Sequence, residues 1–201
     1  NGHIYMVPVS QHFVGFYYNK KIFADNGLTP PSNWAEFLAL GEKLKASKIT
    51  PIALGSKAKW PAQFWFDYLL LRTAPIDYRN RLMAGEASFT DPEVKRVLSL
   101  WHDLIKAGFF NPRPNELDFD TGAAMMVRNG EAAMTLMGTW LSGYYHGMTP
   151  AWNEDSGYGF FPFPTIDPGI PRVALGPIDG LVVPKSARNI EGAKSVVKYF
   201  T

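Results

Sequence analysis

The sequence contains no cysteine among its 201 residues. This absence excludes disulfide bonds, thiol chemistry and zinc sites with cysteine ligands, and it is compatible with an exported protein. No apolar run approaches the roughly 18 residues that a membrane-spanning helix needs. The formal net charge is only +2. Lysine and arginine form no basic stripe with interleaved exposed aromatic residues, so nucleic-acid binding is not expected.

The sequence motifs of the common enzyme classes are missing as well. There is no G-x-S-x-G elbow, P-loop, G-x-G-x-x-G or H-E-x-x-H. The histidines are far apart and lack the spacing of metal ligands; they are His3, His12, His102 and His146. The motifs therefore predict no enzyme, no cofactor and no metal site.

Acidic residues leave two alternatives open. Glu116, Asp118 and Asp120 alternate in a way that could gather a hard cation such as calcium, although a solvated loop explains the same pattern. Glycoside hydrolysis needs two carboxyl groups at a separation of about 5 to 9.5 Å, which a sequence cannot supply. Asp179 or Asp67 could pair with Glu116, so a carbohydrate-active enzyme that uses Asp179 and a second carboxylate is the alternative function.

The most informative stretch is NGEAAMTLMGTW, at residues 129–140. An apolar run of strand length stands between Gly130 and Gly138, which predicts a short buried strand that ends at a loop. Thr139 is expected to cap a following helix, with Trp140 in its first turn. A large indole beyond the carboxyl end of a strand lies where open α/β sheets bind ligands. The alternative is that Trp140 is an ordinary core residue.

The remaining pattern predicts an α/β fold. Strands are expected at 3–9, 13–18, 50–54 and 158–163 and within 173–184, a turn at 20–31, and helices at 62–72, 121–129 and from 189 onward. Because strands and helices alternate along most of the chain, we expect a partly parallel sheet.

Two helices carry clear starting signals. Asn33 with Glu36 forms a capping box, and Asp91 followed by Pro92 is expected to cap the helix that ends before Gly108. The apolar face predicted for the first helix is Trp34, Phe37, Leu38 and Leu44. The face predicted for the second is Val94, Val97, Leu98, Trp101, Leu104 and Ile105.

Four stretches, found in one order, carry a family resemblance. They are residues 7–44, Trp60 with the aromatic helix that follows it, FDTGAAMMVRNGEAAMTLMGTW at 119–140, and LGPIDGLVVPKSARNIEGAKSVVKYF at 175–200. Together they resemble the extracellular solute-binding proteins of sugar ABC transporters, the maltose-binding protein type. The Gly-Glu-Ala-Ala-Met run before Gly-Thr-Trp is the most specific part.

The resemblance implies a class II periplasmic-binding fold, in which two lobes hold a sugar between them. Residues 16–172 would form one lobe, whereas 1–15 and 173–201 would cross to the other, so the chain resembles a fragment of a longer protein. The implied partners are a mono- or oligosaccharide and the membrane permease of an ABC importer. The implied location is periplasmic or extracellular, either free or held at the bacterial surface by a lipid anchor outside this chain.

Sugar-binding residues follow from the resemblance position by position. They are Trp140, Trp60, His12, Gln11, Asp179 and Gly176. The two tryptophans match residues that stack on sugar rings, and the rest would meet hydroxyl groups from the stretches at 11–12 and 176–180. Maltose-binding protein has a carboxylate at the position of His12, which suggests a different sugar or a different contact, with the adjacent Gln11 as the alternative contact residue. A pyranose has an apolar C–H face and a rim of hydroxyls, and these residue types match both.

Overall fold

A computed structural model describes residues 4–200 of the chain. Contacts within it divide the chain into two compact units. The larger unit is Val14–Leu175, and the smaller one combines the segments that precede and follow it. Each unit is described by itself below.

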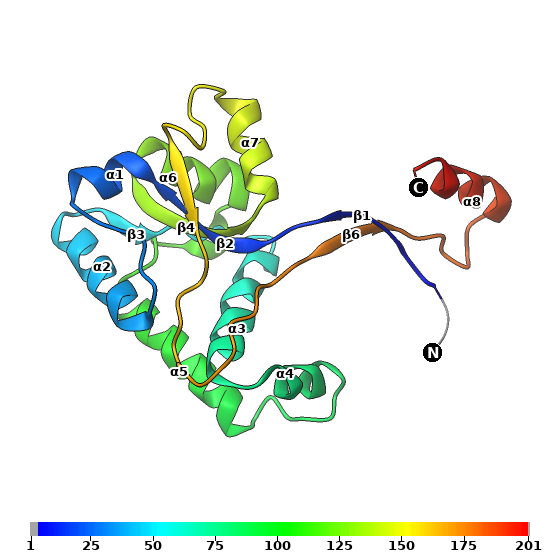
Figure 1. Cartoon of the computed structure of the whole chain (residues 1–201), viewed down its shortest axis with the longest axis horizontal. Helices are drawn as coiled ribbons and strands as arrows, with labels where there is room; N and C mark the ends of the chain where they lie inside the picture. The colour runs from blue at the N-terminus through cyan, green and yellow to red at the C-terminus, as the bar shows by residue number, and fades with distance from the viewer. Residues whose placement is uncertain (1–3, 201) are drawn as a thin grey trace. The chain divides into compact units, whose positions relative to one another are not determined.

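The larger unit contains a mixed sheet and the helices around it (Figure 1). Its strands are β2 (Val14–Asn19), β3 (Thr50–Ile52), β4 (Ala132–Gly138) and β5 (Tyr158–Phe161). Its α-helices are α1 (Lys20–Asp25), α2 (Trp34–Ala46), α3 (Trp60–Thr73), α4 (Ile76–Met83), α5 (Pro92–Lys106), α6 (Met125–Asn129) and α7 (Trp140–Met148). A 3-10 turn, η1 (Pro114–Glu116), and a π-helical turn, η2 (Phe119–Ala124), complete it.

The strand order of this sheet is β3-β4-β2-β5. β4 is parallel to β3, and β2 is antiparallel to both of its neighbours. Every residue of β4 is buried, as expected for a strand covered on both faces. The predicted α/β class, the partly parallel sheet and the buried strand after Gly130 are therefore confirmed.

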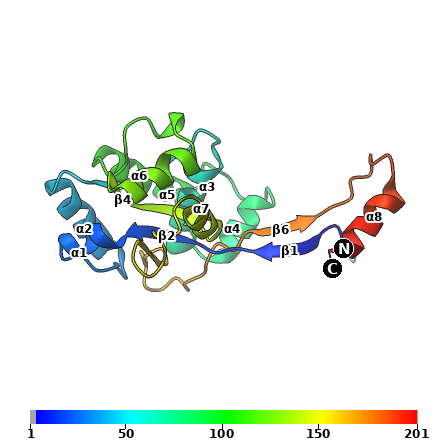
Figure 2. The ribbon, with the colours of Figure 1, turned by 90° about the horizontal axis from the view of Figure 1, so that it is seen from above.

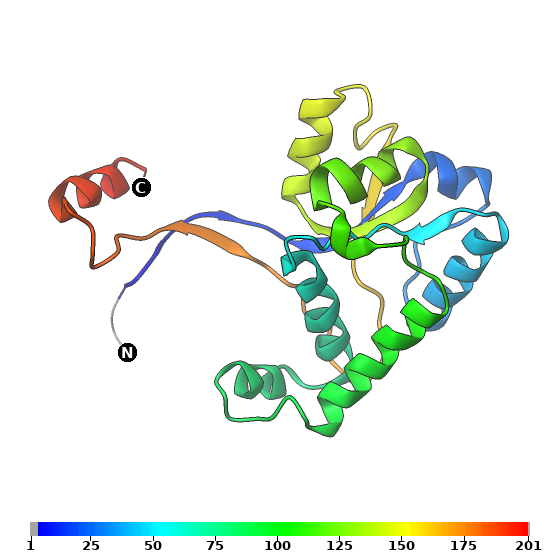
Figure 3. The ribbon, with the colours of Figure 1, turned by 180° about the vertical axis from the view of Figure 1, so that it is seen from behind.

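Alternating residues of β2 show what covers each face of the sheet. Phe16 packs against Phe37 of α2 and Trp65 of α3, with ring centroids 5.3 and 5.7 Å away. Tyr17 points to the opposite face, where its hydroxyl lies 2.8 Å from Ser142 Oγ of α7. Figures 1 and 2 both show α7 over β2. Figure 3 shows α5 alongside α3, with which it packs.

One sequence prediction was wrong between β2 and α2. Instead of a turn throughout 20–31, residues 20–25 form helix α1. The Asn19 side chain caps this helix by accepting a hydrogen bond from Ile22 N at 3.1 Å. Ile22 and Phe23 are buried, so tertiary packing stabilises a helix too short to form on its own.

The capping predictions had mixed outcomes. Asn33 Oδ1 accepts from Glu36 N at 3.0 Å, as predicted, but the Glu36 carboxylate returns to Ser32 N at 2.8 Å rather than to the cap residue. Asp91 precedes α5 without a side-chain cap bond to the helix. Its carboxylate instead accepts from Ser88 N at 3.0 Å.

Parts of the predicted apolar faces are exposed. Leu38 of α2 and Leu98 and Ile105 of α5 are 36%, 50% and 56% exposed, whereas Val94, Val97 and Leu104 are buried as predicted. Each helix contacts its neighbours along a narrower stripe than its apolar residues span, so the residues at the stripe's margin remain in solvent. Gly41 and Leu40 take the buried places in α2 instead.

The smaller unit holds β1 (Val7–Gln11), β6 (Ile178–Leu181) and α8 (Ile190–Tyr199). The two strands pair antiparallel, with an irregularity between Pro8 and Ser10 that accommodates the proline. The strand predicted at 3–9 thus lies later, at 7–11, and its first residue, His3, is outside the described residues. Asn189 caps α8 by accepting from Gly192 N at 2.8 Å.

Candidate functional site

Trp140 lies where the sequence predicted, in the first turn of the helix that follows β4. Its six-membered ring lies directly over Gly138. A Cβ atom on this glycine would lie 2.0 Å from Trp140 Cζ3 and 2.2 Å from Cη2. Only a residue without a side chain permits this approach. Trp140 itself is half-buried, so it is anchored on the core without being enclosed by it.

Trp60 reaches the same edge of the sheet by a parallel route. β3 and β4 run in the same direction, and the chain leads from β3 to Trp60 as it leads from β4 to Trp140. Because the carboxyl ends of parallel strands meet at one edge, the two indoles come together. Their ring centroids are 5.8 Å apart, with the planes at 61°.

Three further rings join the two tryptophans. The ring centroids of Phe64 and Phe119 lie 5.6 and 4.9 Å from that of Trp60. The ring centroid of Tyr144 lies 5.5 Å from that of Phe119. We call this set, Trp60, Phe64, Phe119, Trp140 and Tyr144, the aromatic platform. Phe64 is buried, Tyr144 is exposed and the other three are half-buried. The platform therefore combines partly exposed aromatic rings with a base that belongs to the core.

Sequence reasoning missed Phe119 and Tyr144. Phe119 begins the π-helical turn η2. The loop that follows β3 packs against the start of this turn and holds it in place. A Cβ on Gly55 would lie 2.3 Å from Asp118 O, and Lys57 Nζ is 3.0 Å from Asp118 Oδ2. The signal for Tyr144 was present, since it stands four residues after Trp140 and a helix places such residues on one face.

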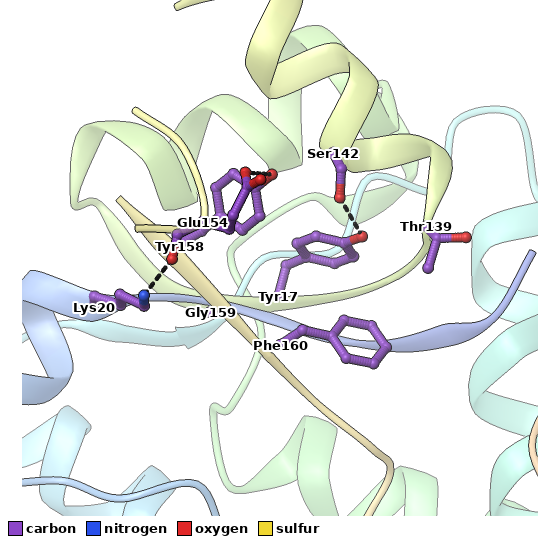
Figure 4. Close-up of a pocket in the computed structure, with 8 residues that line it drawn as sticks. All are labelled: Tyr17, Lys20, Thr139, Ser142, Glu154, Tyr158, Gly159 and Phe160. Atoms are coloured by element: carbon purple, nitrogen blue, oxygen red, sulfur yellow. Dashed lines mark hydrogen bonds between the residues drawn. The ribbon is translucent and has the colours of Figure 1, made fainter. Parts of the chain in front are cut away.

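A hollow of about 520 Å³ elsewhere in this unit is lined by aromatic rings together with several polar side chains (Figure 4). Its lining residues are Tyr17, Lys20, Thr139, Ser142, Glu154, Tyr158, Gly159 and Phe160. Lys20 Nζ donates to the backbone oxygen of Glu154, and Tyr158 donates to the Glu154 carboxylate at 3.2 Å. Burial raises the pKa of Tyr17 and of Tyr158 above the ordinary tyrosine value.

The other four predicted residues lie in the smaller unit. Asp179 Oδ2 is 3.1 Å from His12 Nε2 and accepts a hydrogen bond from Ser10 at 3.1 Å. Gln11 pairs with Ile178 across the strands. A Cβ on Gly176 would lie 3.4 Å from the Gln11 amide nitrogen, so these two residues are neighbours, while His12 and Asp179 form a polar cluster. Ser10, which sequence reasoning missed, belongs to it.

The structure thus brings the predicted residues together in two groups. The tryptophans meet in the larger unit, and in the smaller one His12 contacts Asp179 while Gln11 lies next to Gly176.

Three of the other acidic candidates from the sequence, Asp67, Glu116 and Asp118, are engaged in ion pairs. Asp67 is buried and lies 2.8 Å from Arg79 Nε, and Glu116 pairs with Arg113 at 3.1 Å. Residues 4–200 contain no group of three or more His, Cys, Asp or Glu side chains placed to hold a metal ion. No helix within the same range is long and apolar enough to cross a membrane.

Comparison with known proteins identifies the family to which this chain belongs. The family model described as bacterial extracellular solute-binding protein matches residues 1–201. The chain belongs to this family. Its members are solute-binding receptors rather than enzymes. The comparisons give no support to the glycoside hydrolase alternative.

Individual members of the solute-binding family resemble the chain along its whole length. An uncharacterized ABC transporter extracellular-binding protein of Pyrococcus horikoshii is 34% identical, over 99% of this chain and 43% of the relative. The solved solute receptor AcbH has an exclusive preference for β-D-galactopyranose. It is 33% identical to this chain at a TM-score of 0.78, and the match covers 99% of this chain and 49% of the AcbH chain. A solved chitin oligosaccharide binding protein is 26% identical at a TM-score of 0.86, and the match covers 100% of this chain and 50% of the chain of that protein.

The chain therefore spans about half the length of the relatives that it matches. Its fold is that of the periplasmic solute-binding proteins, present in part. The class II architecture expected from the sequence resemblance is confirmed at this level.

Proposed function

We propose that this chain is the carbohydrate-recognising part of the binding protein of a sugar ABC importer. The observation that carries the proposal is the pair of half-buried indoles, Trp60 and Trp140, at the carboxyl edge of two neighbouring parallel strands. Open α/β sheets bind ligands outside this edge. A sugar ring has apolar C–H faces that flat aromatic rings cover without burying a polar group.

The polar residues have the complementary role. His12, Gln11 and Asp179 would satisfy sugar hydroxyls, and Gly176 leaves room for them. Buried hydroxyls without hydrogen-bond partners are costly, so such groups decide orientation and specificity. In this proposal residues 16–172 form the sugar-binding lobe, and the segments on either side of it belong to the other lobe.

The family supports the rest of the assignment. ABC importer binding proteins work outside the cytoplasm, so we propose a periplasmic or extracellular location, with the membrane permease as the protein partner and a lipid anchor as one means of retention. Sugar binding is supported by the relatives, because AcbH prefers β-D-galactopyranose and another solved relative binds chitin oligosaccharides.

Isothermal titration of the full-length protein with a panel of mono- and oligosaccharides tests the proposal. Trp140→Ala should raise the Kd of the bound sugar about 5- to 150-fold, since one stacked ring is worth about 1–3 kcal/mol by analogy with bases on aromatic side chains. Truncation of a fully buried tryptophan to alanine typically lowers the free energy of unfolding by about 3–5 kcal/mol, and Trp140→Ala should lower it by less than this.

Trp34→Ala is the matched control. Trp34 is also half-buried, also the first residue of a helix, and stacks on Phe37 at 5.2 Å rather than on the platform. It should lower stability and leave sugar affinity unchanged. The proposal fails if no sugar binds, or if Trp140→Ala lowers the melting temperature while the affinity stays at the wild-type value.

A further inference from the structure

The outer side of α7 carries a hollow that shares Trp140 with the proposed sugar site and whose other lining residues the proposed function does not use. Its volume is about 390 Å³, and its lining residues are Trp140, Gly143, Tyr144, Gly147 and Met148. It is a shallow, open depression rather than an enclosed cavity, so a ligand there would lie on the surface of the helix. Because Trp140 and Tyr144 belong to both, the hollow continues the aromatic platform along the helix.

The lining is suited to a flat, amphipathic ligand. Tyr144 and Met148 are 39% and 46% exposed, although a tyrosine ring and a thioether side chain are often buried in folded domains. A tyrosine offers an apolar face together with a hydroxyl, and methionine adapts its shape to irregular partners. Together with Trp140 they form an apolar wall with one polar tip.

The floor of the hollow is bare because two helical positions have no side chain. Gly143 and Gly147 are one turn apart and share a face of α7. A Cβ at either position would meet no atom within 4 Å, so protein packing does not demand glycine there. Gly41 of α2 differs, because the Phe109 ring occupies the place of its Cβ.

Glycine inside a helix lowers stability relative to alanine. The protein therefore gives up helix stability at two adjacent turns and gains only open space beside Trp140. Sites that trade stability for room are expected where a ligand binds. The axial distance from Trp140 to Gly147 is seven residues, or about 10 Å, so the platform and hollow form an extended surface rather than a single spot.

We infer that this hollow receives a second sugar ring, joined to the ring that stacks on Trp140. The inference rests on the proposed function and refines it: the preferred substrate is an oligosaccharide rather than a monosaccharide. The first ring lies on the tryptophans, and the next ring lies over the two glycines between Tyr144 and Met148. A side chain at Gly147 would occupy the place of the second ring only.

The test uses the full-length protein and three matched ligand series, each with one, two and three rings: β-1,4-linked galactose, xylose and N-acetylglucosamine. Calorimetric titration should show that the wild type binds the two-ring member of its preferred series at least tenfold more tightly than the one-ring member. Gly147→Leu should abolish this difference and leave the one-ring Kd unchanged. Its melting temperature should not fall, because leucine favours the helix and meets open space.

His146→Leu is the control, since His146 is exposed on the same helix and does not line the hollow. It should retain the preference for two rings. The inference is overturned if the wild type binds one ring as tightly as two, or if Gly147→Leu keeps the wild-type difference. Trp140→Ala separates the two proposals: it should weaken one- and two-ring ligands alike, and an unchanged one-ring Kd in that variant refutes the proposed function instead.

Discussion

Gly138→Ala should displace the ring of Trp140 without removing it. The new Cβ would lie 2.0, 2.2 and 2.4 Å from three ring atoms, whereas carbon atoms in contact are about 3.5–4.0 Å apart. The ring therefore has to move by about 1.5 Å. The backbone of Gly138 cannot yield easily, because it pairs with Val14 at the end of a buried strand.

Two costs follow from this displacement. Overpacking a well-packed site typically lowers the free energy of unfolding by about 1–3 kcal/mol. Under the proposed function the sugar would also lose its stacking partner, and a loss of about 1–3 kcal/mol would raise the Kd about 5- to 150-fold. Trp60 and Phe64 stand 5.8 and 6.0 Å from the Trp140 ring and limit where it can go, so the original stacking geometry cannot be restored nearby.

Gly159→Ala separates the two costs. Its Cβ would lie 2.4 Å from Cε1 and Cζ of Tyr18, which is a similar collision with an aromatic ring away from the platform. Urea unfolding should show comparable destabilisation in both variants, while calorimetry on the full-length protein should show weaker sugar binding only in Gly138→Ala. If Gly138→Ala retains wild-type affinity, or both variants lose affinity equally, the ring's position does not decide binding and the reasoning is refuted.

Three predictions concern stability. Arg79→Ala should lower the free energy of unfolding by about 3 kcal/mol, because it leaves the buried Asp67 carboxylate without its cation. Urea unfolding should show this loss, and the double variant that combines Arg79→Ala with Asp67→Asn should recover part of it. Asn111→Ala should cost about 1–3 kcal/mol by the same assay, since Asn111 Oδ1 accepts from buried Leu54 N at 2.7 Å. Burial raises the pKa of Tyr17 and Tyr145 above 10.0, so the unfolded chain loses these protons first and stability should fall as pH rises above about 10; a flatter decline is expected when both are replaced by phenylalanine.

Local signals sufficed for the elements that matter most to the platform. The glycine-bounded apolar run predicted β4, and the residues after it predicted that Trp140 begins a helix at a strand's carboxyl end. These two predictions depend only on residues that are adjacent in the sequence, because turns, strand lengths and helix starts are set by a few neighbouring residues. The start of α2 at Asn33 was predictable for the same reason.

Tertiary structure decided the rest. Which side of α5 faces the core depends on where α3 lies, so the exposure of Leu98 and Ile105 could not be read from periodicity. Phe119 contacts Trp60 only because the loop after β3 packs against the turn that carries Phe119, and these segments are far apart in the sequence. A sequence shows which residues are aromatic, but ring-to-ring contact needs distances of a few ångströms, and the packing of strands and helices alone sets those distances.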